Sequence, residues 1–356
     1  MKKILLISNK VYHYRVSIYN YFNTVFNKHG YELIVLTNHI QKDNPHNIQF
    51  KLIVKPFHFF DYRKIILDIK PDVVIYFLHL KDLILWPLIL WLKFKRIKII
   101  YWGHGIYLED TRNSLKRSLF HFLHSMSDAL ILYSENEKKY VSNQYWHKTF
   151  IANNTLNFDD IPTINDSKND IKGKYKIPFK RIVLFVARIT PEKRIDDLLD
   201  AAQLFNEGTG VVVVGGGLNL QQEQKIQKSH NIFYLGELYD KLKINQVFKM
   251  ADVFCIPGAI GLGINQAFYW GLPVVTEDLH HAPEKIYLKN NINGFIFKQG
   301  NIQMLAEKIN YILISPSLYD AFSARAKEEI MRNGNIDTMC NGFISAIGFL
   351  ENRKDK

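Results

Sequence analysis

Short apolar runs alternate with helix-length amphipathic segments along most of this chain. The runs are rich in Val, Ile and Leu and lack polar alternation, which is typical of strands in parallel sheets that helices cover on both faces. They predict β-strands at Ile4–Ile7, Leu33–Leu36, Val73–Phe77, Ile97–Trp102, Ala129–Tyr133, Ile182–Val186, Val211–Val214, Ile232–Leu235, Val253–Ile256 and Pro273–Thr276. We therefore expect two doubly wound α/β units, with ligands bound beyond the carboxyl ends of the strands.

A polar segment from Asp159 to Lys176 interrupts this rhythm near the middle of the chain and predicts a linker. The expected division is a Rossmann-like domain over residues 1–165, a second over residues 166–335, and a C-terminal helix and tail over residues 336–356. A chain of 356 residues that is 47% hydrophobic can bury two cores.

Cysteine usage and the absence of an export pattern favour a cytoplasmic protein. The two cysteines, Cys255 and Cys340, lack metal-ligand spacing, which fits a reducing compartment. The N-terminus leads directly into the first predicted strand and has no signal-peptide pattern. The longest apolar run, Leu83 to Leu92, has ten residues, against the roughly 20 that span a bilayer, so we expect no membrane span.

The net charge of +12 lies mainly in the first half of the chain. Residues 1–165 hold 22 Lys and Arg against 13 Asp and Glu. No helix-turn-helix, zinc-finger or RNA-recognition pattern accompanies these charges, so we expect no nucleic acid as partner. An anionic bilayer surface or a phosphate-bearing acceptor is the better match.

The segment from Lys81 to Arg96 combines an apolar run, Trp86, Trp91 and a basic end. Trp with Lys and Arg suits the headgroup boundary of a bilayer, which indicates peripheral docking on the inner face of the cell membrane. A fully buried crossover helix is the alternative. Docking is favoured by three cations on the next amphipathic segment, Arg112, Lys116 and Arg117.

Two cations follow the strand that opens the second half, in the stretch from Val183 to Arg194. The order Thr190-Pro191-Glu192 predicts a helix start with an N-cap, a first-turn proline and a first-turn acid. Arg188 and Lys193 would then meet an anion such as a pyrophosphate at a helix N-terminus. A strand-turn-helix with solvated charges is the alternative interpretation.

Glycines follow the next two strands. Gly216 is the centre of a triple glycine after the strand at 211–214, and Gly236 and Leu238 follow the strand at 232–235. Missing side chains let a ligand approach the backbone, and they also permit a tight turn. The residues alone leave both explanations open.

A strand end, a glycine-rich turn, a helix of about nine residues and another strand follow one another from Pro257 to Thr276. The backbone amides at the helix start are placed to face a diphosphate. One turn further on, Gln266 would reach a ribose hydroxyl. The amides in question are those of Gly261, Leu262 and Gly263.

Together these motifs resemble the family 4 retaining glycosyltransferases of GT-B fold. The matching motifs cover nearly all of residues 180–300 in the family's order, and weaker ones occur at 101–105 and 151–157. They read ARITPEKR with Arg188 and Lys193, VVVVGGG, FYLGEL, GLGINQAFYWGLPVV, NNINGFIF, YWGHG and IANNTLN.

The resemblance implies two Rossmann-like domains that face each other across a cleft. It also implies transfer of a sugar, with retention, from a nucleotide-sugar donor on the second domain to a glycan or lipid-linked acceptor on the first. Neither a metal nor another cofactor is expected. Arg188 and Lys193 would neutralise charge on the leaving diphosphate, whose phosphate takes the acceptor proton.

The chain departs from the family at its Glu-x7-Glu motif, which falls on Gly258 and Gln266. We expect the donor to be read instead by the backbone from Ala259 to Gly263 and by Glu284. The preceding pair, His280 and His281, invites a zinc interpretation. Adjacent histidines rarely aim at one ion, so a polar turn is favoured.

Polar residues also follow two strands of the first half. His104 lies between glycines after the strand at 97–102 and resembles the family's histidine near the transferred sugar, with a surface turn as the alternative. Hydrogen bonding to a donor hydroxyl or steering of the acceptor is its expected role, because no acid adjoins it in sequence.

Lys10, Tyr14 and Arg15 follow the first strand and are candidates for holding an acceptor phosphate.

The interpretation that fits these motifs is a metal-independent hexosyltransferase of cell-surface polysaccharide synthesis, such as lipopolysaccharide or capsule. Two alternatives stay open. A nucleotide-sugar epimerase of the same fold would use the same donor site. A catalytically inactive nucleotide-binding subunit is suggested by the missing carboxylates at Gly258 and Gln266.

Overall fold

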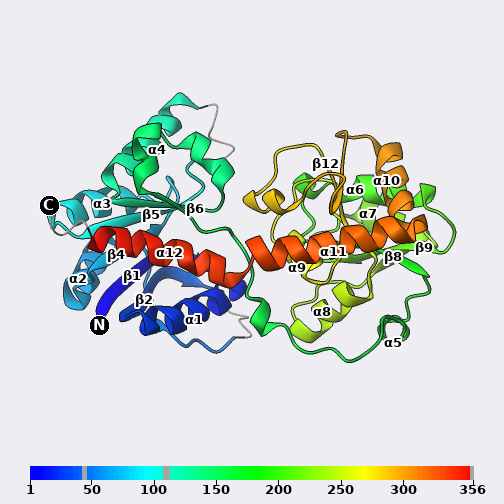
Figure 1. Ribbon diagram of the computed structural model, residues 1–356, viewed down its shortest axis with the longest axis horizontal. Coiled ribbons are helices and arrows are strands. Elements are labelled where there is room, and N and C mark those ends of the chain that lie inside the picture. The colour runs from blue at the N-terminus through cyan, green and yellow to red at the C-terminus, as the bar shows by residue number, and fades with distance from the viewer. Residues whose placement is uncertain (42–45, 107–112, 353–356) are drawn as a thin grey trace. The chain divides into compact units, whose positions relative to one another are not determined.

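The computed structural model describes residues 1–41, 46–106 and 113–352. The chain divides into two compact units (Figure 1). The first comprises Met1–Asn157 with Ile336–Lys356, and the second comprises Phe158–Asn335. The boundary thus lies a few residues before the expected one at 165, and the C-terminal segment joins the first unit instead of standing apart.

The first unit is built on a seven-stranded sheet in the order β3-β2-β1-β4-β5-β6-β7, in which every pair of neighbours is parallel. The order reverses direction between β1 and β4, which makes the carboxyl ends of these two strands the expected place for a ligand. The strands are β1 (Lys2–Val11), β2 (Tyr31–Ile40), β3 (Lys51–Val54), β4 (Val73–Phe77), β5 (Lys98–Gly103), β6 (Ala129–Leu132) and β7 (Thr149–Ile151).

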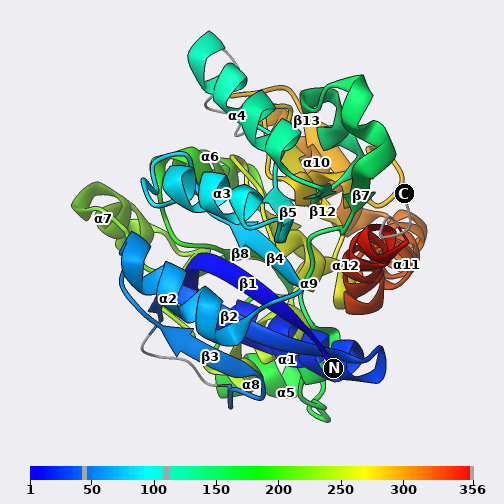
Figure 2. The same cartoon turned by 90° about the vertical axis from the view of Figure 1, so that its left-hand side faces the viewer.

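Both faces of this sheet are buried under helices (Figure 2). Along β1, Ile4 and Leu6 pack into one hydrophobic core, whereas Leu5 and Ile7 pack into the other, because successive side chains point to opposite faces. The first core contains α1 (His13–Lys28) and α12 (Ile336–Glu351); the second contains α2 (Phe59–Ile69), α3 (Leu85–Phe94) and α4 (Ser114–Met126). Two short 3-10 helices follow, η2 (Glu135–Tyr140) and η3 (Asn143–Lys148).

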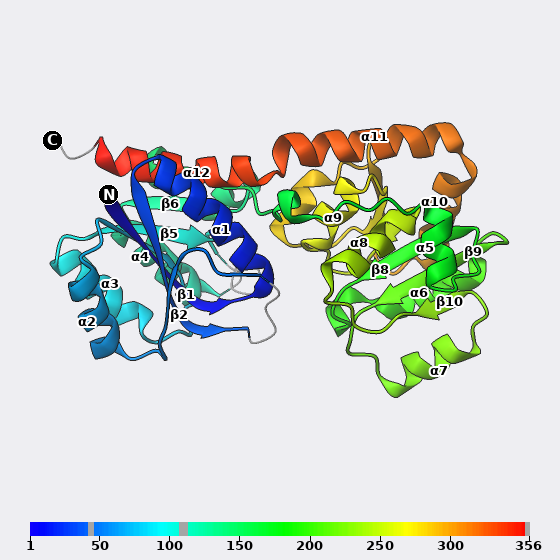
Figure 3. The ribbon, with the colours of Figure 1, turned by 90° about the horizontal axis from the view of Figure 1, so that it is seen from below.

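The C-terminal helix α12 is part of the core of the first unit (Figure 3). The ring of Phe343 lies 4.8 Å from that of Phe22 and 4.9 Å from that of Trp102. A Cβ atom on Gly342 would come within 2.3 Å of the carbonyl oxygen of Ile151, so glycine permits the helix to approach β7 closely. The C-terminal helix, which was expected together with a tail over residues 336–356, is therefore a structural element of the first unit.

The second unit repeats the plan with a six-stranded parallel sheet in the order β10-β9-β8-β11-β12-β13. Its switch point lies between β8 and β11. The strands are β8 (Arg181–Val186), β9 (Thr209–Val214), β10 (Ile232–Tyr234), β11 (Val253–Cys255), β12 (Val274–Glu277) and β13 (Gly294–Phe297). The helices are α5 (Lys168–Lys174), α6 (Ile195–Ala201), α7 (Leu220–Lys228), α8 (Lys241–Met250), α9 (Gly263–Tyr269), α10 (Ile302–Ile314) and α11 (Pro316–Asn333), with 3-10 turns η4 (Phe158–Asp160), η5 (Pro191–Lys193), η6 (Ala202–Leu204) and η7 (Pro283–Tyr287).

Each run that was predicted as a strand forms one, and the prediction of two parallel Rossmann-like α/β units is confirmed. Three strands were missed, namely β3, β7 and β13, and each lies at the edge of its sheet. The expected linker contains η4 and α5. Among the helices of the described residues, none combines the length and apolar character needed to cross a bilayer.

Candidate functional site

The loops that follow β8, β9, β10, β11 and β12 lie at one edge of the second sheet, because all of these strands are parallel. Every residue of the second unit that was predicted to act on a donor belongs to these loops or to the elements that they enter. The strand order therefore assembles segments that the sequence placed almost a hundred positions apart.

The loop after β8 carries the two predicted cations. Arg188 is exposed, and Lys193 is half-buried with its ammonium donating a hydrogen bond to the carbonyl oxygen of Ala259 at 2.5 Å. Burial lowers the pKa of Lys193, while the carboxylates of Glu192 and Glu284 act in the opposite direction. Both cations also lower the pKa of Glu192, behind stronger hydrogen-bonding effects, so their charges lie near the same carboxylate.

The predicted helix start is present with Thr190, Pro191 and Glu192 in the expected positions, but it forms a 3-10 turn and not the first turn of an α-helix. Pro191–Lys193 forms a 3-10 turn, the Thr190 side chain makes no capping bond, and α6 begins only at Ile195. Arg194 ends the turn in the left-handed conformation, with φ at 52°. The local sequence did not reveal this break because a distant partner stabilises it.

That partner is Glu277 at the end of β12, whose side chain is fully buried. Its Oε1 lies 3.0 Å from Nε of Arg194, and its Oε2 accepts a hydrogen bond from the N–H of Gly300 at 2.8 Å. Nη2 of Arg194 lies 2.7 Å from the carboxylate of Asp197. Burial raises the pKa of Glu277, and the arginine opposes that shift. The pair anchors the loop that presents Arg188 and Lys193.

The loop after β11 is joined to the cationic loop by backbone hydrogen bonds. The N–H of Gly258 donates to the carbonyl of Lys193 at 3.0 Å, and that of Ala259 donates to the carbonyl of Glu192 at 2.7 Å. A Cβ atom on Gly258 would lie 2.0 Å from the Glu192 oxygen. Glycine is therefore required for a close backbone approach, and the N–H groups of Gly258 and Ala259 are already used within the protein.

The start of α9 offers more room. Gly261 has no heavy atom within 4 Å of where its Cβ would be, and Gly263 lies under the ring of Phe254. The first N–H groups of a helix have no intrahelical acceptor, which applies to the amides around Leu262 and Gly263. These amides remain the ones best placed for an anion.

One turn into α9, the side chain of Gln266 contacts α8. Its Nε2 donates to Oδ1 of Asn245 at 3.0 Å, and the same oxygen accepts from Nε1 of Trp270 at 2.9 Å. The amide oxygen of Gln266 is the group that this arrangement leaves for a ribose hydroxyl.

The triple glycine after β9 packs against the cationic loop. A Cβ atom on Gly215 would come within 1.8 Å of the carbonyl oxygen of Ala187, and the carbonyl of Gly216 accepts from the N–H of Ile189 at 2.8 Å. Gly236 has φ at 73° with open space around it, and Leu238 is half-buried. The tight-turn explanation thus accounts for the first cluster, whereas Gly236 is accessible.

The two adjacent histidines after β12 have different surroundings. His280 is exposed, whereas His281 is buried, with Nδ1 accepting from the N–H of Ile260 at 3.1 Å and Nε2 donating to the carbonyl of Glu277 at 2.8 Å. Burial lowers the pKa of His281 to about 4. Both ring nitrogens are occupied, and the described residues include no group of three or more His, Cys, Asp or Glu that could hold a metal. Glu284 is buried close to Lys193.

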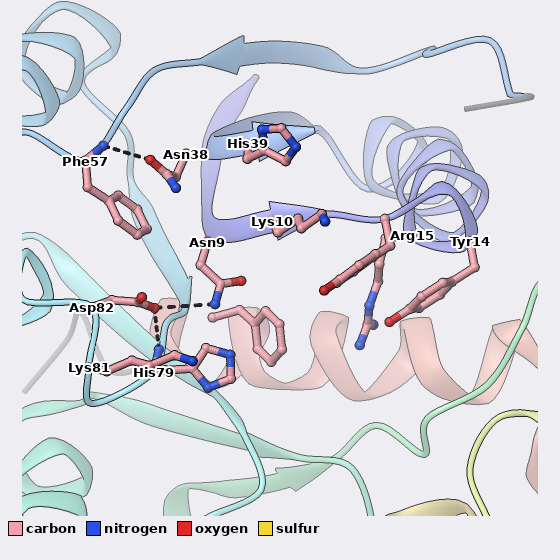
Figure 4. A pocket seen from close by; sticks show the side chains of 12 residues that line it. Asn9, Lys10, Tyr14, Arg15, Asn38, His39, Phe57, His79, Lys81 and Asp82 are labelled. Atoms are coloured by element: carbon pink, nitrogen blue, oxygen red, sulfur yellow. Dashed lines mark hydrogen bonds between the residues drawn. The ribbon is translucent and has the colours of Figure 1, made fainter. Parts of the chain in front are cut away.

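In the first unit, a cavity of about 420 Å³ lies at the switch point between β1 and β4 (Figure 4). All three predicted acceptor residues, Lys10, Tyr14 and Arg15, line it. The other lining residues were not among the predicted acceptor residues; they are Asn9, Tyr12, Asn38, His39, Phe57, Phe77, His79, Lys81 and Asp82.

Arg15 is buried among aromatic rings. Its Nη2 donates to the hydroxyl of Tyr133 at 2.8 Å, and its guanidinium lies 4.7 Å from the ring centroid of Trp102. Further rings lie within 6 Å, those of Tyr14 and Phe77. Burial alone would lower the pKa of Arg15, but the neighbouring tyrosine oxygens raise it, so the side chain stays charged.

The imidazole of His104 is oriented by the carboxylate of Glu137, which was not predicted from the sequence. Its Nδ1 lies 2.8 Å from Oε1 of Glu137, and the other oxygen of that carboxylate accepts from the N–H of Ser134 at 3.1 Å. The ring of His104 also contacts Tyr133, with centroids 4.8 Å apart. Glu137 could have been predicted as an ordered side chain from the Ser-x-x-Glu pattern of a capping box that begins at Ser134.

We expect His104→Ala to lower kcat/KM about tenfold for the sugar transfer that the sequence motifs predict, because a hydrogen bond from an oriented imidazole contributes roughly 1.5 kcal/mol. Glu137→Gln should produce a smaller loss that is absent in the His104→Ala background. Steady-state kinetics of the two single variants and the double variant measure this coupling. His29→Ala, at an exposed position of the same unit, is the control, and additive losses would contradict the assignment.

Helix α3 is buried on one side and exposed on the other. Leu85, Leu88, Ile89 and Leu92 enter the core, whereas Leu83 is 79% and Phe94 is 80% exposed. Leu90 of α3, with Leu115 and Phe122 of α4, adds to the exposed apolar side chains, and exposed cations accompany them, namely Lys95, Arg96, Lys116 and Arg117. Arg112 lies outside the described residues. The alternative of a fully buried crossover helix is therefore wrong, and membrane docking stays a prediction.

The second unit is similar in sequence to known glycosyltransferases. Residues 167–329 match the family model described as glycosyl transferases group 1. Poly(ribitol-phosphate) alpha-N-acetylglucosaminyltransferase of Staphylococcus aureus is 24% identical over 202 residues, which are 54% of this chain and 40% of that protein. An uncharacterized glycosyltransferase of Haemophilus influenzae is 22% identical over 239 residues, which are 65% of this chain and 64% of that protein. Each match spans less than two thirds of the curated relative.

Among solved structures, that of Anabaena HepE in complex with UDP-glucose matches with a TM-score of 0.76 at 16% identity. The match covers 99% of this chain and 100% of that chain. The likeness shows that this chain has the GT-B type of fold, with two parallel-sheet Rossmann-like domains.

Proposed function

We propose that this protein transfers a sugar from a nucleotide-sugar donor to an acceptor with retention of configuration. The match of residues 167–329 to the glycosyl transferases group 1 model supports this proposal. The observation that carries the proposal is the edge of the second sheet. There, Arg188 and Lys193 share a loop that is hydrogen-bonded to the turn leading into the accessible start of α9. Two cations and helix-start amides suit a diphosphate.

In this mechanism the bond between the anomeric carbon and the diphosphate oxygen breaks while the acceptor oxygen bonds to the same face of the sugar. The acceptor proton passes to the departing phosphate. Arg188 and Lys193 stabilise the negative charge that grows on the leaving diphosphate, which is an effect larger in the transition state than in the ground state. Because these cations supply the positive charge, the proposal includes no metal ion. The presence of UDP-glucose in the HepE complex supports a nucleotide-sugar donor.

We assign the acceptor to the first unit and infer that it is a glycan or a polyol-phosphate polymer of the cell surface. The poly(ribitol-phosphate) acceptor in the name of the Staphylococcus aureus relative supports this choice. Hydrogen bonding of a substrate hydroxyl is the role of His104. The exposed apolar and basic side chains of α3 and α4 would hold the protein peripherally on the cytoplasmic face of an anionic membrane.

The direct test of the proposed function is a product analysis with UDP-, GDP-, ADP- and dTDP-linked sugars and a panel of glycan and polyol-phosphate acceptors. We expect acceptor-dependent release of nucleoside diphosphate and a product with the anomeric configuration of the donor. An epimerised free nucleotide sugar without acceptor would support the epimerase alternative. Nucleotide binding with no turnover on any acceptor would support the inactive subunit, which the absence of carboxylates at Gly258 and Gln266 motivates.

Membrane docking is tested separately by flotation with vesicles. We expect Leu90→Glu combined with Phe94→Glu to reduce binding to anionic vesicles at least tenfold, because burial of each exposed side chain contributes roughly 1.5–3 kcal/mol. Met331→Glu, at an exposed position on α11, is the matched control. Absence of wild-type binding to anionic vesicles would remove this part of the proposal.

A further inference from the structure

We propose that the cavity at the β1–β4 switch point binds a phosphate group carried by a sugar or polyol, with Arg15 as the side chain that holds the anion (Figure 4). The inference rests on the proposed function and names the chemical class of the acceptor.

Arg15 is a buried cation with an unused hydrogen-bond donor. The residue is only 5% exposed, and its Nη1 is buried without a hydrogen-bond partner. In the part of the chain that the structure describes, no carboxylate forms an ion pair with it, and its charge is compensated by aromatic faces and by tyrosine hydroxyls, among them those of Tyr133 and Tyr14. A buried cation with an unused donor costs several kcal/mol unless an anion satisfies it. Since Arg15 lines the cavity, a bound phosphate would supply that anion.

Cationic side chains outnumber carboxylates around the cavity. Lys10, Arg15 and Lys81 contribute three cations, against the single carboxylate of Asp82. That carboxylate is already used, since it accepts from the N–H of His79 at 2.7 Å and from Nδ2 of Asn9 at 3.4 Å. The cavity therefore retains an excess of positive charge.

The beginning of α1 adds to this field. Arg15 lies in the first turn of this 16-residue helix, whose N-cap residue, Tyr12, makes no side-chain capping bond. No acidic residue occupies the first turn. The N–H of His13 donates to the amide oxygen of Gln41 at 3.4 Å, but no acidic side chain of the first turn neutralises the positive end of the helix dipole, which therefore favours an anion beside the guanidinium.

The size and lining of the cavity indicate that the phosphate is not alone. A volume of about 420 Å³ exceeds the needs of one phosphate. The rings of Tyr12 and Tyr14 stack with centroids 5.9 Å apart and planes at 9°, which provides flat surfaces for the C–H faces of a sugar or polyol. Burial lowers the pKa of His79, so its neutral ring can exchange hydrogen bonds with a hydroxyl.

The cavity is connected to His104 through one side chain. The hydroxyl of Tyr133 accepts the hydrogen bond from Arg15, and the ring of the same tyrosine contacts His104. An acceptor whose phosphate lies at Arg15 would therefore extend toward the imidazole to which we assign a substrate hydroxyl. The phosphate would act as a positioning group for the reacting hydroxyl.

The experiment is calorimetric titration of the full chain with ribitol 5-phosphate, ribitol and inorganic phosphate. We expect ribitol 5-phosphate to bind at least tenfold more tightly than either of the others. Arg15→Met should weaken that binding tenfold or more. If this variant does not fold, the double variant Lys10→Ala, Lys81→Ala tests the same loss of phosphate binding. Its fold should be retained, because Lys81 is exposed and Lys10 is half-buried. Lys64→Ala, at an exposed position on α2 outside the cavity, is the matched control.

Three outcomes would overturn the inference: equal binding of ribitol and ribitol 5-phosphate, equal binding of inorganic phosphate and ribitol 5-phosphate, or no effect of the cavity variants. Binding to anionic vesicles should be unchanged in Lys10→Ala, and its loss would assign the cavity to a lipid headgroup instead. Nucleotide-sugar binding is measured on the same samples. If it persists while phosphate selectivity is absent, the inference fails and the proposed function stands.

Discussion

Lys193→Ala and Arg188→Ala are each expected to lower turnover about 10²-fold or more while the fold stays intact. The reason is that each removes a positive charge from the loop to which we assign the leaving diphosphate. Loss of one electrostatic partner of a transition-state charge costs roughly 2.7–4 kcal/mol in comparable sites. Lys193 should show the larger effect, since its ammonium is half-buried and partly desolvated. Single-turnover kinetics with saturating donor measure the chemical step.

Conservative variants separate charge from structure. Lys193→Arg and Arg188→Lys keep the positive charge and should retain more activity than the alanine variants. Lys228→Ala, an exposed residue of α7, is the control and should be indistinguishable from wild type. Near-wild-type turnover in both alanine variants would refute the assignment of these cations.

Gly258→Ala is expected to lower the free energy of unfolding by about 3 kcal/mol and to weaken donor binding at the same time. The new Cβ atom would lie 2.0 Å from the carbonyl oxygen of Glu192 and 2.7 Å from the carbonyl carbon of Lys193. Both are backbone atoms, so relief requires a shift of the cationic loop itself. Chemical denaturation and nucleotide-sugar titration of the same sample measure the two effects.

Gly261→Ala is the matched control, three positions further along the same loop. No heavy atom lies within 4 Å of its added Cβ, so we expect a change in the free energy of unfolding within about 0.5 kcal/mol. Gly258→Glu, which restores the carboxylate of the resembling family, should be at least as harmful as Gly258→Ala. Wild-type stability in Gly258→Ala would show that the loop does not depend on this close approach.

The central strands were predictable from the sequence because burial on both faces demands continuous apolar runs, as in Ile4–Ile7 and Val211–Val214. The edge strands were not. Each residue of β3 is exposed or half-buried, and its sequence begins with Lys51. A strand with one neighbour and a partly solvated face needs only a short apolar run, and the three apolar residues of β3 after Lys51 were too few to distinguish it from a loop.

For the candidate site, the sequence located the loops better than it located the contacts within them. Arg188, Lys193 and Arg15 were selected as candidates because each follows a strand end, where parallel sheets place ligands. Glu137 beside His104 and Glu277 beside Arg194 were missed, because both pairs form only when separate strands bring distant segments together.

Gly258 shows a second limit of sequence reasoning. A glycine that admits a ligand and a glycine that admits another backbone are the same in sequence, and only the position of Glu192 distinguishes them. Gly261, three residues later, has the open surroundings that Gly258 lacks.

Calorimetric titration tests most directly whether Arg188 and Lys193 hold the diphosphate of the donor. UDP-, GDP-, ADP- and dTDP-sugars are titrated into the wild-type chain and into the Arg188→Ala, Lys193→Ala double variant. We expect at least one nucleotide sugar to bind the wild type, and we expect the double variant, with an unchanged melting temperature, to bind it at least 10²-fold more weakly. Equal affinity of both proteins for that nucleotide sugar, or no binding of any of the four by the wild type, would contradict this assignment.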